Sequence, residues 1–202
     1  MKTIKTVLFS IALLIGVNAS AQLGINPLSF GVKGGVNMSN FGGDLKDTSA
    51  KAGWNAGITV DLSLPANLYL ASGVELTTKG AKYRVEGVSS KASVSPMYIQ
   101  IPVHLGYKVH AFPTTNILFH AGPYWAYGLS GKQKIGGEKF DFFGDKGIAK
   151  RNDFGLGFGV GAEFLGKIMV GANCDFGLLN ISDVKGTTIR NQNAYLSVGY
   201  KF

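Results

Sequence analysis

The chain has 202 residues, with 29 glycines, 13 phenylalanines, one cysteine and a formal net charge of +8. Glycine therefore reaches about twice its usual share of ~7%. Charged residues make up only 16% of the chain, yet no internal stretch approaches the roughly 18 apolar residues of a membrane-spanning helix. The composition excludes an intramolecular disulfide, and it leaves a closed β-barrel as the way to cross a membrane.

The N-terminus has the pattern of an export signal. Two lysines among the first five residues precede an apolar run from Val7 to Val17, and Ala19-Ser20-Ala21 fits the small-residue cleavage rule. We expect residues 1–21 to be a cleaved signal peptide and residues 22–202 to form one barrel domain; an uncleaved anchor helix is the alternative. Because export removes the chain from nucleic acid, we expect no nucleic-acid partner.

Beyond this segment, apolar and polar residues alternate in runs, as they do on strands whose side chains point to opposite faces. In the clearest run, Phe154 to Phe164, large apolar residues alternate with four glycines and Glu163. The pattern suits a wall with lipid outside and a narrow interior, where glycines leave room for larger neighbours such as Tyr124 and His104. Eight strands are predicted, at about Phe30–Met38, Ala52–Leu62, Leu68–Lys79, Met97–Val109, Thr115–Leu129, Phe154–Phe164, Lys167–Leu178 and Ala194–Phe202.

Two prolines interrupt the predicted ladders. Pro102 and Pro123 lie inside the fourth and fifth strands. Because proline has no N–H to donate, we expect a bulge or a local break near each.

The connections alternate strictly in length. Short ones are predicted at about residues 63–67, 110–114 and 165–167, and long polar ones at about 39–51, 80–95, 130–152 and 179–192. Short turns on one side and long loops on the other are typical of transmembrane barrels. The sequence therefore predicts an all-β, eight-stranded antiparallel up-and-down transmembrane barrel. A soluble lipid-binding barrel is the alternative, but it would need an apolar interior.

The predicted strands carry a balanced set of charges, and the net positive charge falls in the long loops. Buried charges are tolerated when they are paired and hydrogen-bonded. We therefore expect the inward-facing charged residues to form a structural network inside the barrel. Its members are Lys33, Asp61, Glu75, His104, Lys108, Glu163, Asp175 and Lys201.

No recognisable catalytic, cofactor or metal motif is present. The histidines are His104, His110 and His120, and no neighbouring residues complete a nucleophile–base–orienter set. We expect His104 and His120 to be interior residues with partners, and Cys174 to pack on the apolar face of a strand. The sequence therefore predicts a protein that is not an enzyme and that has no cofactor and no bound metal.

The chain resembles the PorT-like family of small outer-membrane barrels of Gram-negative bacteria. That resemblance implies a barrel of about this size, and it implies that the terminal Phe202 is the signal read by the barrel-assembly machinery. It implies no single activity, although the founding member belongs with a protein secretion system. The residues that carry the resemblance are F-G-V-K-G-G-V-N-M-S (30–39), G-V-E-L-T-T-K-G-A-K (73–82), Y-I-Q-I-P-V-H-L-G-Y-K (98–108), D-F-G-L-G-F-G-V-G-A-E-F (153–164) and Y-L-S-V-G-Y-K-F (195–202).

Three functions fit these observations. The first is a barrel with a filled interior that supports envelope integrity or surface interaction through its outer loops; its partners would be outer-membrane lipid and lipopolysaccharide. The second is a component of a secretion or transport apparatus, and the third is a lipid-modifying enzyme. Basic loop residues that could meet lipopolysaccharide phosphates are Lys79, Lys82, Arg84, Lys91, Lys132, Lys134, Lys139, Lys150 and Arg151.

Overall fold

The computed structural model describes residues 28–45, 47–84, 92–135, 138–144 and 147–202. The predicted signal peptide, residues 1–21, lies outside the described residues. Within them, no helix is long and apolar enough to span a membrane. The described residues form ten strands: β1 (Leu28–Gly43), β2 (Ser49–Ser63), β3 (Leu68–Thr78), β4 (Ala81–Tyr83), β5 (Ala92–Phe112), β6 (Thr115–Ile135), β7 (Glu138–Asp141), β8 (Asn152–Phe164), β9 (Ile168–Gly177) and β10 (Ile189–Lys201).

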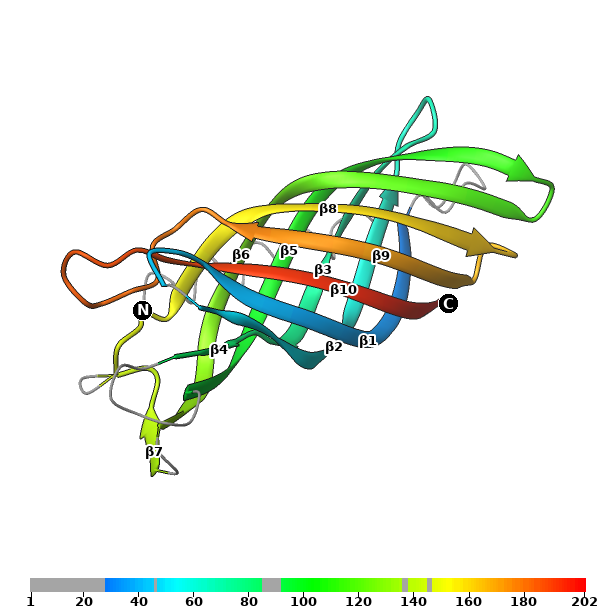
Figure 1. Cartoon of the computed structure of the whole chain (residues 1–202). Helices are drawn as coiled ribbons and strands as arrows, with labels where there is room; N and C mark the ends of the chain where they lie inside the picture. Colours follow the sequence, from blue (N-terminus) through cyan, green and yellow to red (C-terminus); the bar gives the residue numbers. More distant parts are fainter. Residues whose placement is uncertain (1–27, 46, 85–91, 136–137, 145–146) are drawn as a thin grey trace, which may run out of the picture.

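Eight of these strands close into a ring. Each long strand pairs antiparallel with the next in the order β1, β2, β3, β5, β6, β8, β9 and β10. The ring closes where β1 pairs with β10, from Gly31 opposite Lys201 to Gly43 opposite Ile189. The short strands β4 and β7 add to this ring at one end, where β4 joins β2 to β5 and β7 pairs with β6 (Figure 1). The predicted eight-stranded up-and-down barrel is therefore confirmed.

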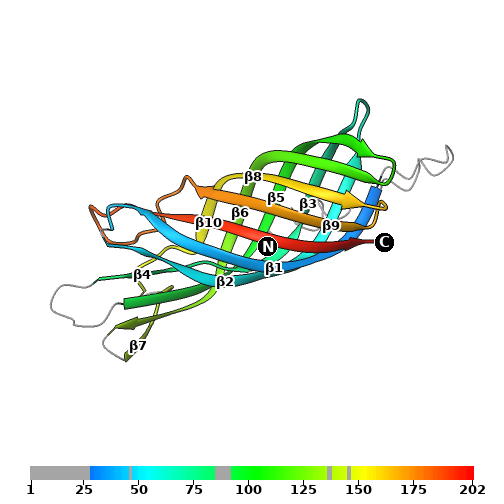
Figure 2. The same cartoon turned by 45° about the vertical axis from the view of Figure 1, so that its right-hand side comes forward.

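The two ends of the barrel differ, as the alternation of connections predicts. The short connections, residues 64–67, 113–114 and 165–167, lie at the same end as the C-terminus, and we call this the turn end. The long connections, with β4 and β7, lie at the opposite end, which we call the loop end (Figures 1 and 2). Up-and-down topology produces this separation, because each long connection is followed by a short one.

The outer wall is apolar and the lumen is polar. Val36 is 65% exposed and Ile58 56% exposed, whereas inward-facing Glu75 is only 3% exposed. The single cysteine, Cys174, is exposed on the outward face of β9, as its apolar neighbours predict. A barrel that is apolar outside and polar inside is suited to lipid, and this facing argues against the soluble lipid-binding alternative.

The strands extend further at the loop end than the sequence indicates. β5 and β6 each contain 21 residues, which corresponds to ~70 Å of extended chain at ~3.4 Å per residue. The apolar band of an outer-membrane barrel is only about 25 Å tall. The predicted loops 80–95 and 130–152 therefore contain strands that continue beyond the band. The backbones of these extensions form ladder hydrogen bonds although their side chains are polar. This is possible because strands outside the membrane need not present an apolar face.

Both prolines interrupt a ladder without changing its register. On β5, Pro102 faces Tyr124 of β6 in register but has no ladder partner on β3, and on β6, Pro123 pairs with Leu156 of β8 but has none on β5. The predicted local breaks are thus present. The register shifts between β5 and β6 lie elsewhere, between Met97 and Tyr98 and between His110 and Phe112.

Candidate functional site

Ion pairs fill the lumen near the turn end. The ammonium of Lys201 lies 2.6 Å from a carboxylate oxygen of Asp61 and 2.5 Å from one of Glu163. Lys108 lies 3.9 Å from the same Glu163, and this carboxylate also accepts a hydrogen bond from Asn116. The strands β2, β5, β8 and β10 thus meet through one group of charges. Asp61 also lines a cavity of about 100 Å³ in the lumen.

A second ion pair lies in the lumen, farther from the turn end. Lys33 of β1 contacts Glu75 of β3 at 2.6 Å across the strand between them. In the register of the sheet, Lys33 and Glu75 both lie opposite Gly57 of β2. The missing side chain at Gly57 leaves space for this pair, since a Cβ there would lie 3.0 Å from Cγ of Glu75.

The other two predicted residues have neutral partners. Asp175 accepts a hydrogen bond of 2.9 Å from the amide of Gln100. His104 stacks on His120, with ring centroids 5.0 Å apart and their Nδ1 atoms separated by 2.9 Å. The structure therefore places six of the eight predicted residues in ion pairs, and it places Asp175 and His104 in hydrogen bonds on the same lumen.

The glycines of β8 make room for these rings, as predicted. A Cβ on Gly159 would lie 2.3 Å from Nε2 of His120, and one on Gly157 would lie 2.7 Å from Nε2 of His104. A Cβ on Gly155 would likewise lie 2.7 Å from the Tyr124 hydroxyl. The alternation of glycine with large apolar residues therefore serves packing. The glycine face of β8 accommodates side chains of the interior, and the apolar face points outward.

A buried ion pair that sequence reasoning missed lies further toward the loop end. Nζ of Lys79 is 3.0 Å from Oδ2 of Asp153, and both side chains are fully buried. Asn191 also donates to this oxygen at 2.9 Å, and the ammonium lies over the rings of Tyr124 and Tyr98, with centroids at 4.4 and 5.4 Å. Burial is tolerable because the charge is paired and surrounded by polar partners.

An apolar cluster fills the lumen beyond this pair. It contains inward-facing residues of several strands, including Phe41 of β1 and Ile189 of the adjacent β10, together with Phe142 and Phe143 from the segment after β7. Phe142 stacks on Phe41 with centroids 6.2 Å apart, and Phe143 meets Tyr98 edge to face at 5.6 Å. We call this cluster the apolar plug. Its remaining members are Ala81, Val94, Tyr124, Ala126, Ala149 and Ile181.

The predicted basic loop residues do not form one group. Lys79 is buried, so the expectation that it meets a surface anion is wrong. Arg151 is occupied by the carbonyl oxygens of Gly128 and Leu129 and stacks near Phe143. Lys91 lies outside the described residues. The exposed members are Lys82, Arg84, Lys132, Lys134, Lys139 and Lys150.

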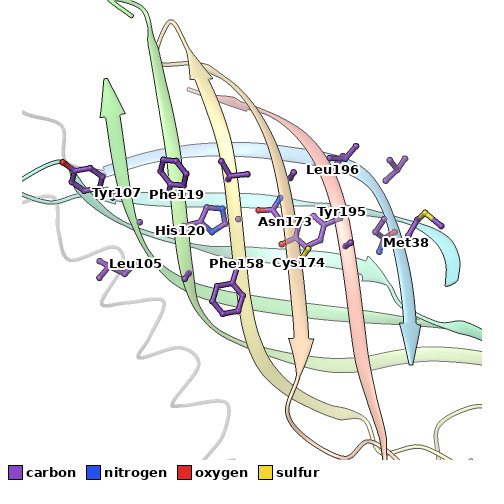
Figure 3. Close-up of a pocket in the computed structure, with 18 of the residues that line it drawn as sticks. Met38, Leu105, Tyr107, Phe119, His120, Phe158, Asn173, Cys174, Tyr195 and Leu196 are labelled. Atoms are coloured by element: carbon purple, nitrogen blue, oxygen red, sulfur yellow. The ribbon is translucent and has the colours of Figure 1, made fainter. Parts of the chain in front are cut away.

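A broad hollow on the outer wall is lined largely by outward-facing apolar side chains. Leu105 of β5, Phe158 of β8 and Leu196 of β10 lie along it, and Figure 3 shows His120 of β6 and Asn173 of β9 on the strands between them. Phe158 is 48% exposed and Leu196 59% exposed. This surface belongs to the apolar belt of the barrel, so its chemistry fits lipid acyl chains better than a polar ligand.

The described residues contain no group of three or more histidine, cysteine or acidic side chains arranged to hold a metal ion. His110, at the turn end, contacts Oδ1 of Asn116. Among the described residues, each inward-facing charged side chain has a protein partner. Aromatic rings pack the lumen at the loop end. The interior is therefore closed by its own side chains.

A closed eight-stranded ring with an apolar outer wall and a polar, side-chain-filled lumen defines a small outer-membrane-type β-barrel. The family model for the outer membrane protein beta-barrel domain matches residues 9–202, so the chain belongs to that family. Family membership indicates that the barrel resides in the bacterial outer membrane. In such barrels the short turns typically face the periplasm and the longer loops face outward.

Several solved structures are similar to this chain at low sequence identity. Neisserial surface protein A is 14% identical, with a TM-score of 0.50, over 86% of this chain and 97% of that one. OprG from Pseudomonas aeruginosa is 14% identical, with a TM-score of 0.47, over 86% and 95%. Ail of Yersinia pestis is 13% identical, with a TM-score of 0.41, over 86% and 98%. None of the curated proteins matches the sequence.

Proposed function

We propose that the protein is a non-conducting outer-membrane barrel that supports envelope integrity or surface interaction through its loop end. The main support for the proposal is the apolar plug, which lies on the loop-end side of the buried ion pair between Lys79 and Asp153. Inward-facing residues of several strands meet there, and the ion pair beneath them has no exposed surface. A lumen packed in this way offers no path for solutes, so the exposed strand extensions and loops are the surface available for function.

Complementation separates this proposal from its competitors. A strain that lacks the protein would receive the wild-type gene, a variant shortened in the loop residues 183–187, which lie outside the apolar plug, or a variant with His104→Ala and His120→Ala. Envelope leakiness to a large antibiotic would be measured in each strain. We expect the loop variant to fail and the histidine variant to complement, provided that both reach the outer membrane. The reverse outcome would favour a catalytic site in the lumen and would overturn the proposal.

A role in a secretion apparatus is the second candidate, and the PorT-like resemblance of residues 30–39, 73–82, 98–108, 153–164 and 195–202 favours it. A barrel of this size without an open lumen would act there as an assembly partner. Deletion would then strand exported proteins in the periplasm. Fractionation of the deletion strain, with proteins counted in periplasm and medium, distinguishes this role from envelope support.

We further propose that the barrel-assembly machinery reads the C-terminal strand. Phe202 is 77% exposed at the turn end, and its backbone N–H donates to the carbonyl of Phe30 at 2.9 Å. Its ring is therefore available to a partner while its backbone continues the barrel seam. Phe202→Ser should lower the amount of assembled barrel in the outer membrane, whereas Phe140→Ser, at an exposed ring of the loop end, should not.

A further inference from the structure

The outer face of the loop-end extension carries a cross-strand row of lysines. Lys82 of β4 pairs with Ser93 of β5, Ser93 pairs with Lys134 of β6, and Lys134 pairs with Lys139 of β7. Residues paired across antiparallel strands point to the same face. Lys132, two residues before Lys134 on β6, lies on this face as well. The row therefore spreads positive charge across four neighbouring strands.

The opposite face of the same strands is packed against the plug. Val94 of β5 is fully buried and belongs to the plug, and its partner Gln133 is 6% exposed and bonds the Tyr83 hydroxyl. The lysines, which alternate with these residues, must point away from the barrel axis. Lys82, Lys132, Lys134 and Lys139 are all exposed.

A fifth lysine joins the row from β2. Nζ of Lys51 donates to the carbonyl of Val94 at 3.2 Å and to the hydroxyls of Ser93 and Ser95. These oxygens use its three protons, so Lys51 contributes fixed charge while its exposed neighbours contribute free donors. The pKa of Lys51 is held below its ordinary value by partial burial and then by the charges of Lys82 and Lys134. Ser93, which accepts from Lys51, is the cross-strand partner of both Lys82 and Lys134, so the three lysines gather around one residue.

Among the residues that the structure describes, the row has few acidic partners. Lys132 forms an exposed pair with Asp141 of β7 at 2.8 Å. Glu138, the other acidic residue of β7, pairs with Ile135 and so alternates with Lys139 onto the opposite face. The side chains that we call the lysine face, Lys51, Lys82, Lys132, Lys134 and Lys139, thus carry a clear excess of positive charge.

The lysine face begins just beyond the outer aromatic residues. Trp54 of β2 and Trp125 and Tyr127 of β6 are exposed on the outer wall, and such residues mark the membrane–water interface. Lys51 lies three residues beyond Trp54 and Lys132 five beyond Tyr127, or about 10 and 17 Å at ~3.4 Å per residue. That is the depth of the headgroups of the outer leaflet.

The bulge in β6 directs the lysines toward this layer. Met97 pairs with Ser130 but Tyr98 pairs with Gly128, so Leu129 is an extra residue on β6. Below the bulge, odd-numbered residues such as Tyr127 face outward; above it, Lys132 and Lys134 do. Without the extra residue, the alternation would turn these two lysines toward the plug.

We propose that the lysine face binds the phosphate groups of the lipopolysaccharide that surrounds the barrel in the outer leaflet. Several ammonium groups and two serine hydroxyls at headgroup depth match a phosphorylated glycolipid, whose acyl chains lie on the apolar wall below. This rests on the proposed function, because it assigns a partner to the loop end. Binding ties the barrel to its lipid neighbours and neutralises the crowded charge of Lys51, Lys82 and Lys134.

The test is native mass spectrometry of the purified barrel in detergent, titrated with phosphorylated lipid A and with enzymatically dephosphorylated lipid A. The variant K82Q/K134Q/K139Q should weaken binding of phosphorylated lipid A by about 100-fold, at roughly tenfold or less per lysine. The control K150Q/K185Q/R190Q removes the same charge from exposed residues elsewhere at the loop end and should bind as wild type. The charge-preserving K82R/K134R/K139R should retain most of the binding. Heat-modifiable gel migration establishes that each variant is folded.

Three outcomes overturn the proposal: equal binding of both lipid A forms, equal loss in the control variant, or wild-type binding by K82Q/K134Q/K139Q. An arm with inorganic pyrophosphate separates a free anion from a lipid, since tight binding of pyrophosphate alone would assign the face to a soluble ligand. Envelope leakiness of the K82Q/K134Q/K139Q strain is scored separately. If binding is lost but the envelope remains intact, the lipid contact stands and the proposed function fails.

Discussion

Lys79 and Asp153 form an ion pair of 3.0 Å with no exposed side-chain surface, from strands on opposite sides of the barrel lumen. Asp153 is the second residue of β8 and Lys79 directly follows β3, so the pair crosses the lumen on the turn-end side of the apolar plug. Each charge would be costly to bury alone, and together with Asn191 and Tyr124 they form a polar layer that supports the plug.

Breaking this pair should destabilise the barrel strongly. Lys79→Met leaves the Asp153 carboxylate buried without its counter-charge, and we expect a loss of about 3–5 kcal/mol in the free energy of unfolding. Urea unfolding of barrels folded into lipid vesicles measures it. Lys79→Met combined with Asp153→Leu should recover part of the loss, because no unpaired charge remains. As control, Asp141→Asn breaks the exposed pair with Lys132 and should leave stability unchanged.

The contact between Gly159 and His120 predicts a steric effect. Gly159→Ala would place a Cβ 2.3 Å from the imidazole and 2.2 Å from the Asn173 amide oxygen, at an expected cost of about 1–3 kcal/mol in unfolding free energy. The matched control is Gly171→Ala on the neighbouring strand β9, an inward position where the nearest atom to an added Cβ is 3.5 Å away. If both substitutions have equal effects, strand propensity rather than packing governs these glycines.

The outward facing of β8 predicts a depth-dependent cost of charge. Val160 is 45% exposed on the outer wall, and Val160→Arg should cost about 2–4 kcal/mol if the residue lies near the middle of the bilayer. Val184, at 49% exposure in the loop after β9, lies outside the barrel wall, so Val184→Arg should cost little. Vesicle-based unfolding compares the two variants; a negligible cost at Val160 would show that this face does not meet lipid.

Lys51 should titrate below the ordinary lysine pKa of 10.5, because partial burial and the charges of Lys82 and Lys134 disfavour its protonated form. Lys134→Gln removes a like charge and should raise the Lys51 pKa. Between the lowered folded pKa and 10.5, the unfolded chain holds more protons, so this group makes stability rise with pH. Nitrogen NMR of the lysine side chains follows the titration, and an unchanged pKa in the variant would contradict the proximity of these charges.

The membrane-spanning part of the fold could be predicted because lipid imposes a strict rule on it. Every outward position from Phe154 to Phe164 must be apolar, and a period of two is then visible in one sequence. The charged interior could be predicted for the same reason. Lys33, Asp61 and Glu163 lie at inward positions of strands whose alternate, outward residues are apolar.

The loop end could not be predicted in this way. Beyond the membrane, both faces of β6 and β7 carry polar residues, so their alternation carries no signal and residues 130–152 resemble a loop. Lys79 falls at the end of a predicted strand and is grouped with the basic loop residues, and Asp153 falls just before a predicted strand. Each nevertheless continues the inward positions of its strand. Phe142 and Phe143 pack in the lumen through the fold of a connection, which no local pattern records.

Conductance in planar lipid bilayers tests the sealed lumen most directly. Purified wild-type barrel should insert without stepwise conductance, because the plug and the pair of Lys79 and Asp153 block the lumen. A variant with Phe142→Gly and Phe143→Gly serves as the positive control and should show channel events. Steady ohmic conductance of the wild-type protein at the level of this variant would contradict the account.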